Sequence, residues 1–170
     1  MRKPLTVLTM ILMLVVFLPL ISQTAQPAAS KGNEIKRDGR FIAYDNETVL
    51  DTKTNLMWAA KDNGANINWS NAKSYCENYR GGGYSDWRMP TQDELAGLYD
   101  ESLTGYSQDC GSQYSPVKLT NLIHISCCCP WASNTLGPDA PYFDVSYGFV
   151  DWSHQSDVYY LRALPVRSSK

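Results

Sequence analysis

The sequence predicts one exported domain of the α+β class, with two helices and small antiparallel sheets joined by long, disulfide-linked loops. Short β-type runs stand near both ends of the chain, and the segments with helical periodicity lie between them. This segregation of strands from helices is typical of α+β domains. An apolar leader and five cysteines indicate an oxidising compartment outside the cytoplasm.

The first 30 residues resemble a secretory signal. A basic MRK start precedes an apolar run from Leu5 to Ile21, and small polar residues follow. We expect a signal peptide over 1–27 with cleavage between 22 and 30, a linker over 28–34, and one domain over 35–168. An uncleaved anchor is the alternative, although a bilayer span needs about 20 apolar residues. The mature protein is then periplasmic or secreted and free of the membrane.

The charge of the mature chain argues against nucleic acid as a partner. Without Arg2 and Lys3, 13 basic residues stand against 17 acidic ones, a formal net charge of −4. No basic run follows the leader. Phosphate backbones are bound by clustered lysine and arginine, which this sequence lacks.

Three short strands are expected at the start of the domain. Phe41–Tyr44 and Thr48–Leu50 are β-type runs separated by the polar turn 45–47, which indicates a hairpin without a glycine. Leu56–Trp58 follows a second turn and reads as another strand.

A change of period marks the first helix. Ala72, Tyr75, Cys76 and Tyr79 recur at helical spacing and form one apolar face. Ser70 is the expected N-cap, and the glycines 81–83 are expected to end the helix.

The segment GGYSDWRMPTQDEL predicts a rigid connector and a second helix. Thr91 and Glu94 have capping-box spacing, and Pro90 forces an extended residue before them. In the connector, Trp87 is expected to fill the space between the helices. Arg88 is expected to pair with a nearby carboxylate, for which Asp86 is a candidate.

The remainder of the chain predicts a long loop followed by three strands. Residues 103–126 show no period and read as a disulfide-linked loop. Tyr142–Val145, Phe149–Trp152 and Tyr159–Val166 are expected to form an antiparallel meander, with a tight turn at Tyr147-Gly148.

The number of cysteines is odd, so at most two disulfide bridges form. The cysteines are Cys76, Cys110, Cys127, Cys128 and Cys129. A bond between neighbours is possible but strained, because adjacent Cα atoms lie closer than a disulfide usually spans. We expect Cys110 and Cys76 each to reach one cysteine of the triplet. Zinc is not expected, because structural zinc sites use spaced ligand pairs.

In this order, the motifs resemble those of the Lcl C-terminal domain family. The matching residues are Val49, Asp51, Thr54, Leu56–Trp58, Ala72, Tyr75–Asn78, Gly82–Leu95, Trp131–Ser133, Arg162, Ala163, Val166 and Arg167. The D-W-R-x-P-T-x-x-E-L block is the most specific part. The resemblance implies a C-type-lectin-like fold and no settled activity.

The resemblance also bears on ligand and disulfides. The name-giving member is the tip of a collagen-like adhesin that binds glycosaminoglycans, a property not carried over to an acidic chain without collagen repeats. Many members have a cysteine in the last R-x-V-R strand. Here that region is Arg162–Arg167 and has none, so the cysteine triplet is the implied substitute partner of Cys76.

Aromatic residues of the last third are the candidate binding site. Exposed rings suit sugar stacking or protein interfaces, and the alternative is that these rings belong to the core or are scattered over the surface. The candidates are Trp131, Tyr142, Tyr147, Trp152 and Tyr159, while Trp58, Trp69 and Trp87 read as core. We expect a non-catalytic domain that binds glycans or glycoconjugates. The alternative is a periplasmic or extracellular protein-interaction domain.

No cofactor is expected. Asp139, Asp144, Asp151 and Asp157 are scattered acids without a calcium-loop motif, so calcium is possible but unsupported. His124 and Cys127 lie close enough in sequence to suggest cysteine–histidine chemistry. That enzyme hypothesis is a second alternative, because thiols of exported proteins are usually bonded.

Overall fold

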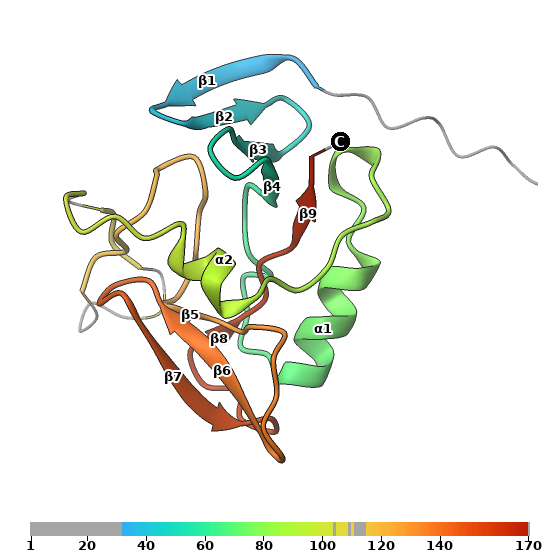
Figure 1. The fold of residues 1–170 in the computed structure, drawn as a ribbon, viewed down its shortest axis with the longest axis vertical. Coiled ribbons are helices and arrows are strands. Elements are labelled where there is room, and N and C mark those ends of the chain that lie inside the picture. The colour runs from blue at the N-terminus through green and yellow to red at the C-terminus, as the bar shows by residue number, and fades with distance from the viewer. Residues whose placement is uncertain (1–31, 104, 109, 111–114, 170) are drawn as a thin grey trace, which may run out of the picture.

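The computed structural model describes residues 32–169 except 104, 109 and 111–114 (Figure 1). The expected signal peptide, its cleavage region and the first part of the linker therefore lie outside the described residues. Within the described part of the chain, no helix is long and apolar enough to span a membrane.

The largest sheet has five antiparallel strands in the order β1-β2-β3-β4-β9. Its strands are β1 Glu34–Asp38, β2 Phe41–Tyr44, β3 Thr48–Asp51, β4 Leu56–Ala59 and β9 Val166–Ser168. The first and the last strand of the described chain thus belong to one sheet and form its opposite edges (Figure 1).

The predicted hairpin is confirmed, and a left-handed residue closes its turn. Glu47, at the end of the β2–β3 turn, has φ of 61°, and Asn55 before β4 has φ of 55°. Asparagine tolerates this conformation better than most residues, whereas glutamate does not favour it. β1 adds a fully exposed edge strand before the hairpin.

The first helix is α1, Trp69–Asn78, and its cap differs from the expectation. Asn68, not Ser70, is the N-cap, because its side-chain oxygen accepts a hydrogen bond from the Asn71 N–H at 2.9 Å. Asparagine is at least as good a cap as serine, and the helix begins two residues earlier than a Ser70 cap predicts. Ala72 and Cys76 form the buried face.

The second helix is α2, Gln92–Ala96, and its capping box is confirmed. Thr91 Oγ1 accepts from the Glu94 N–H at 3.2 Å, and Glu94 Oε2 accepts from the Thr91 N–H at 2.9 Å. Leu95 of this helix and Leu98, which follows it, are buried.

The capping box also decides the ion pairs of the connector. Arg88 donates to both carboxylate oxygens of Glu94, at 2.7 and 2.6 Å, and not to Asp86. Asp86 instead accepts two hydrogen bonds from Arg167 of β9, at 2.6 and 3.0 Å. The box holds Glu94 against the connector, where it lies in reach of Arg88.

Replacement of Thr91 by alanine is expected to lower the free energy of unfolding by about 1 kcal/mol, because the Glu94 N–H loses its acceptor. Thr91→Ser is the matched control and keeps the hydroxyl. Urea titration followed by circular dichroism measures the difference. Equal losses in both variants would contradict the capping role.

Trp87 packs on the sheet, not between the helices as expected. Its ring joins a cluster with Ile42, Leu50 and Met57 of the sheet. Its indole N–H donates to the Gly81 carbonyl at 3.1 Å. The reason is that the connector pairs with the sheet: backbone hydrogen bonds join Arg88 to Val166 of β9.

The expected three-stranded meander is wrong in its third strand. β6 Asp139–Asp144 and β7 Phe149–His154 do form a hairpin. The segment 159–166 instead contains β8 Leu161–Arg162, which pairs in parallel with β5 Cys129–Pro130, and it ends where β9 begins. Pro165 lacks a backbone N–H, and its carbonyl accepts from Ala59, so the chain leaves one sheet for the other there.

The described residues of 103–126 contain no helix or strand, as expected, yet they bury a large part of the main core. Val117, Leu119, Ile123 and Ile125 are almost fully buried. The Tyr106 hydroxyl donates to the Ile123 carbonyl at 2.8 Å and ties the start of this region to its end.

Candidate functional site

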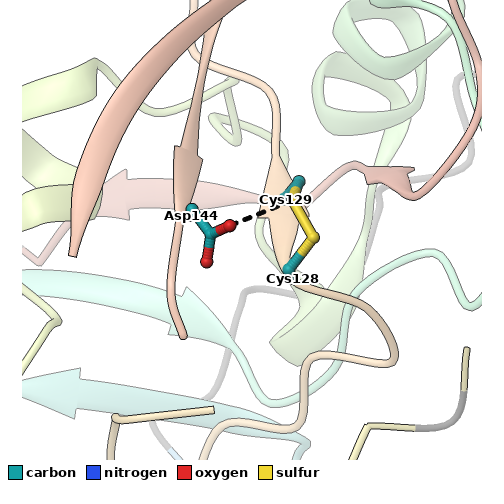
Figure 2. A group of neighbouring side chains, drawn as sticks. All are labelled: Cys128, Cys129 and Asp144. Atoms are coloured by element: carbon teal, nitrogen blue, oxygen red, sulfur yellow. Dashed lines mark hydrogen bonds between the residues drawn. A yellow bond between two sulfur atoms is a disulfide. The ribbon is translucent and has the colours of Figure 1, made fainter. Parts of the chain in front are cut away.

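The disulfides differ from the expected pattern in one bridge. Cys110–Cys127 is formed, as the expectation allowed. Cys76 is free and buried, and the second bridge joins the neighbours Cys128 and Cys129 (Figure 2). The expectation that Cys76 bonds to the triplet is therefore wrong. Cys128 and Cys129 turn their side chains toward each other where β5 begins, with Cα atoms 3.7 Å apart.

This adjacent disulfide lines a pocket of about 220 Å³ between the β6–β7 hairpin and the segment that leads into β8. The hairpin contributes Tyr142, Asp144 and Ser153. The other wall consists of Tyr159, Tyr160 and Leu161. The pocket thus combines three tyrosines, a disulfide and one carboxylate.

The register of the hairpin decides which side chains face the pocket. Successive residues of a strand point to opposite faces, and paired residues share a face. Tyr142 pairs with Asp151 and Asp144 pairs with Phe149, so these four residues lie on the same face of the hairpin. Of them, Tyr142 and Asp144 line the pocket. Trp152 pairs with Pro141 and lies on the other face.

Tyr142 is held from two sides. Its hydroxyl donates to Asp151 Oδ2 at 3.0 Å, and its ring meets the Trp131 ring edge-on at 6.3 Å. Partial burial and the neighbouring Asp151 carboxylate raise the pKa of Tyr142 to about 12. The hydroxyl therefore stays protonated and able to donate at neutral pH.

Asp144 is the charged group of the pocket. Its Oδ1 accepts from the Ser146 N–H at 2.8 Å and the Tyr147 N–H at 3.2 Å, which fixes the carboxylate plane. Its Oδ2 lies 4.0 Å from Cys129 Sγ (Figure 2). Burial raises the pKa of Asp144 above the usual aspartate value.

Tyr160 was not among the predicted site residues. Its backbone is left-handed, with φ of 66°, and its N–H donates to Asn66 Oδ1 at 3.2 Å. A left-handed tyrosine is strained and persists where its surroundings hold it. The doubled tyrosine before β8 was the available signal.

Of the five predicted aromatic residues, Tyr142 and Tyr159 line the pocket. Trp131 is fully buried, and its indole N–H donates to the Ile67 carbonyl at 2.9 Å, so its assignment to a binding surface is wrong. Tyr147 is exposed beside Phe149, outside the pocket, and Trp152 is exposed on the opposite hairpin face.

Two other pockets are similar in volume to the tyrosine pocket, but charged side chains in each of them already form ion pairs. One, of about 260 Å³, contains Arg40, whose guanidinium pairs with Asp51 at 3.2 Å. The other, of about 310 Å³, lies along Trp58, and its acids include Asp51 and Glu94, which are already paired. The tyrosine pocket is the better candidate because its carboxylate has no cationic partner among the lining residues.

The residues of the enzyme hypothesis do not supply a cysteine nucleophile. Cys127 is bonded to Cys110, so its sulfur is not a thiol. His124 stacks on Tyr106, with ring centres 5.3 Å apart.

The four acids considered for calcium do not gather in the described part of the chain. There, the group of three potential metal ligands is Cys128, Cys129 and Asp144. Asp151 accepts from Tyr142, and Asp157 accepts from the Ser153 hydroxyl at 2.6 Å.

The comparison with protein families identifies a known domain in the chain. The model of the Lcl C-terminal domain matches residues 47–167. That range holds both helices, every cysteine and all residues of the tyrosine pocket. A comparison with curated proteins finds no match.

Proposed function

The chain belongs to the Lcl C-terminal domain family, and from this premise we propose that it is an exported, non-catalytic binding domain with a C-type-lectin-like fold. Two helices, small antiparallel sheets and disulfide-linked loops support this fold assignment. The pairing of the last described strand, β9, into the same sheet as the first strands supports it too.

The ligand we propose is a glycan, bound at the tyrosine pocket without a metal ion. The observation that carries this proposal is the grouping of Tyr142, Tyr159 and Tyr160 around one carboxylate. Aromatic faces pack on the apolar faces of sugar rings, while a few convergent polar groups orient the hydroxyls. Tyr159 is 76 % exposed and so offers its ring to a ligand.

The size and charge of the pocket narrow the class of glycan. A volume of about 220 Å³ lies below the usual range of about 300–1,000 Å³ for small-molecule sites, which favours a single terminal sugar. Asp144 is the charged lining residue, so neutral sugars or amino sugars fit better than sulfated ones. The protein's net negative charge also disfavours sulfated sugars.

A protein partner is the second candidate, and exposed rings outside the pocket favour it. Tyr147 and Phe149 are 59 % and 47 % exposed and lie next to each other. Neighbouring exposed aromatic residues are typical of protein interfaces.

Replacement of Tyr159 by alanine is expected to weaken glycan binding by about tenfold, because the sugar loses its stacking partner. The measurement is a glycan array of the oxidised protein, with and without calcium, followed by calorimetry on the best ligand. Trp152→Ala is the matched control, because it removes an exposed ring from the opposite hairpin face.

Equal weakening by both variants would contradict the pocket assignment. An array without any binding would reject the glycan proposal and leave the protein partner. In that case, the Tyr147→Ala/Phe149→Ala variant should lose the captured partner, whereas Tyr159→Ala should keep it.

A further inference from the structure

The disulfide between Cys128 and Cys129 lies next to the Asp144 carboxylate in the tyrosine pocket, and together these residues form a cluster of potential metal ligands. One atom from each of Cys128, Cys129 and Asp144 lies within 4.8 Å of the others (Figure 2). The backbone holds these residues side by side, because the Val145 N–H donates to the Cys128 carbonyl at 2.9 Å. Their placement therefore does not depend on the sulfur–sulfur bond alone.

Reduction changes what these atoms can bind. Bonded sulfur atoms carry no charge and are poor metal ligands, whereas thiolates are strong ligands of thiophilic ions. Ligand atoms lie about 2.0–2.3 Å from a tetrahedral zinc ion. Three of them around one ion are therefore about 3.3–3.8 Å apart. Asp144 Oδ2, at 4.0 Å from Cys129 Sγ, is already close to this spacing, and reduction of the bond lets the two sulfur atoms move apart to reach it.

We propose that the reduced protein binds a thiophilic divalent cation, such as Zn²⁺ or Cd²⁺, through Cys128 Sγ, Cys129 Sγ and a carboxylate oxygen of Asp144. The fourth position of the ion faces the pocket. This proposal concerns the reduced state and does not rest on glycan binding, which is proposed for the oxidised state.

A small-molecule dithiol can act as the reductant of this bond. The dithiol passes two electrons and two protons to the Cys128–Cys129 bond and itself becomes a disulfide. The cation then displaces the two thiol protons to solvent and binds both thiolates. Two thiolates and a carboxylate carry three negative charges, so a divalent cation removes most of their mutual repulsion.

The surroundings of Asp144 suit a ligand. Two backbone N–H groups hold its Oδ1 and leave Oδ2 directed toward Cys129. Hydrogen bonds of this kind orient the carboxylate ligands of metal sites. The pocket supplies the path by which an ion enters.

The test is cadmium binding to the full chain, oxidised and reduced. The protein is reduced with dithiothreitol, freed of it without oxygen, and titrated with Cd²⁺ while the thiolate-to-metal absorption is recorded. We expect one Cd²⁺ per reduced chain and none on the oxidised chain. Circular dichroism checks that the reduced chain remains folded.

Variants separate this site from the other cysteines. Cys128→Ala/Cys129→Ala should abolish the absorption, and Cys110→Ala/Cys127→Ala should keep it. Asp144→Asn retains the Oδ1 acceptor and should weaken binding at least about tenfold. Equal binding by the oxidised chain, or binding kept in Cys128→Ala/Cys129→Ala, would overturn the site. Unchanged affinity in Asp144→Asn would overturn the third ligand.

Discussion

Replacement of Trp131 by alanine is expected to lower the free energy of unfolding by about 3–5 kcal/mol, the range for a large buried aromatic ring. The side chain is fully buried in the cluster beneath α1 and the pocket. The change leaves a cavity, exposes the edge of Tyr142 and leaves the Ile67 carbonyl without its indole donor. Each of these effects acts on the fold and only indirectly on a ligand.

Urea denaturation of the oxidised protein, followed by circular dichroism, measures this loss. Trp152→Ala is the matched control, because that ring is 44 % exposed and its removal should cost less than about 1 kcal/mol. A Trp131→Ala protein with unchanged stability and lost glycan binding would contradict the assignment of Trp131 to the core. It would restore the interpretation drawn from the sequence.

The sequence predicted what depends on local chemistry. The capping box of α2, the β2–β3 hairpin and the buried face of α1 follow from residue types at fixed spacing. The pairing of Asp86 with Arg167 depends instead on where the connector meets β9. That meeting joins residues far apart in sequence, and no local pattern specifies it.

For the candidate site, aromatic enrichment indicated the right hairpin but not its face. Tyr142 and Trp152 both belong to that hairpin, yet pairing with Asp151 and Pro141 respectively sends them to opposite sides. A shift of one residue in register would exchange them. Tyr160 comes to the pocket through a left-handed backbone angle, which a tyrosine does not predict.

The number of cysteines does not determine which of them form disulfides. Five cysteines establish that one is left over, and family resemblance implied that Cys76 would be paired. In the fold, Cys76 lies within α1 in the same apolar cluster as the triplet but remains a thiol. Burial raises the pKa of the Cys76 thiol to about 12, so it is a poor nucleophile for exchange with the neighbouring bridges.

The second large effect is expected at Arg162, where substitution by methionine should cost about 3–5 kcal/mol at neutral pH. Arg162 Nε donates to the Ser126 hydroxyl at 2.7 Å, and that hydroxyl donates to Asp62 Oδ2 at 2.9 Å. Asp62 and Arg162 are both buried, and Nε lies 3.7 Å from the carboxylate. Without Arg162, a buried negative charge remains without a compensating cation.

The pH dependence separates this charge effect from lost packing. Burial raises the pKa of Asp62, while hydrogen bonds from Gly64 and Ser126 and the charge of Arg162 oppose the rise. Removing Arg162 raises this pKa further. A raised carboxyl pKa gives stability that is present below the unfolded value, about 3.9, and is lost as the pH rises through the folded value.

The deficit of Arg162→Met should therefore be largest at neutral pH and shrink as the pH falls toward 4, where Asp62 becomes protonated. Urea titrations between pH 4 and pH 8 measure it. Asp62→Asn in the Arg162→Met background should recover part of the loss at neutral pH and remove its pH dependence. A deficit of the same size at every pH would assign the loss to the other contacts of Arg162, which include hydrogen bonds to Asn66 and the Leu161 carbonyl.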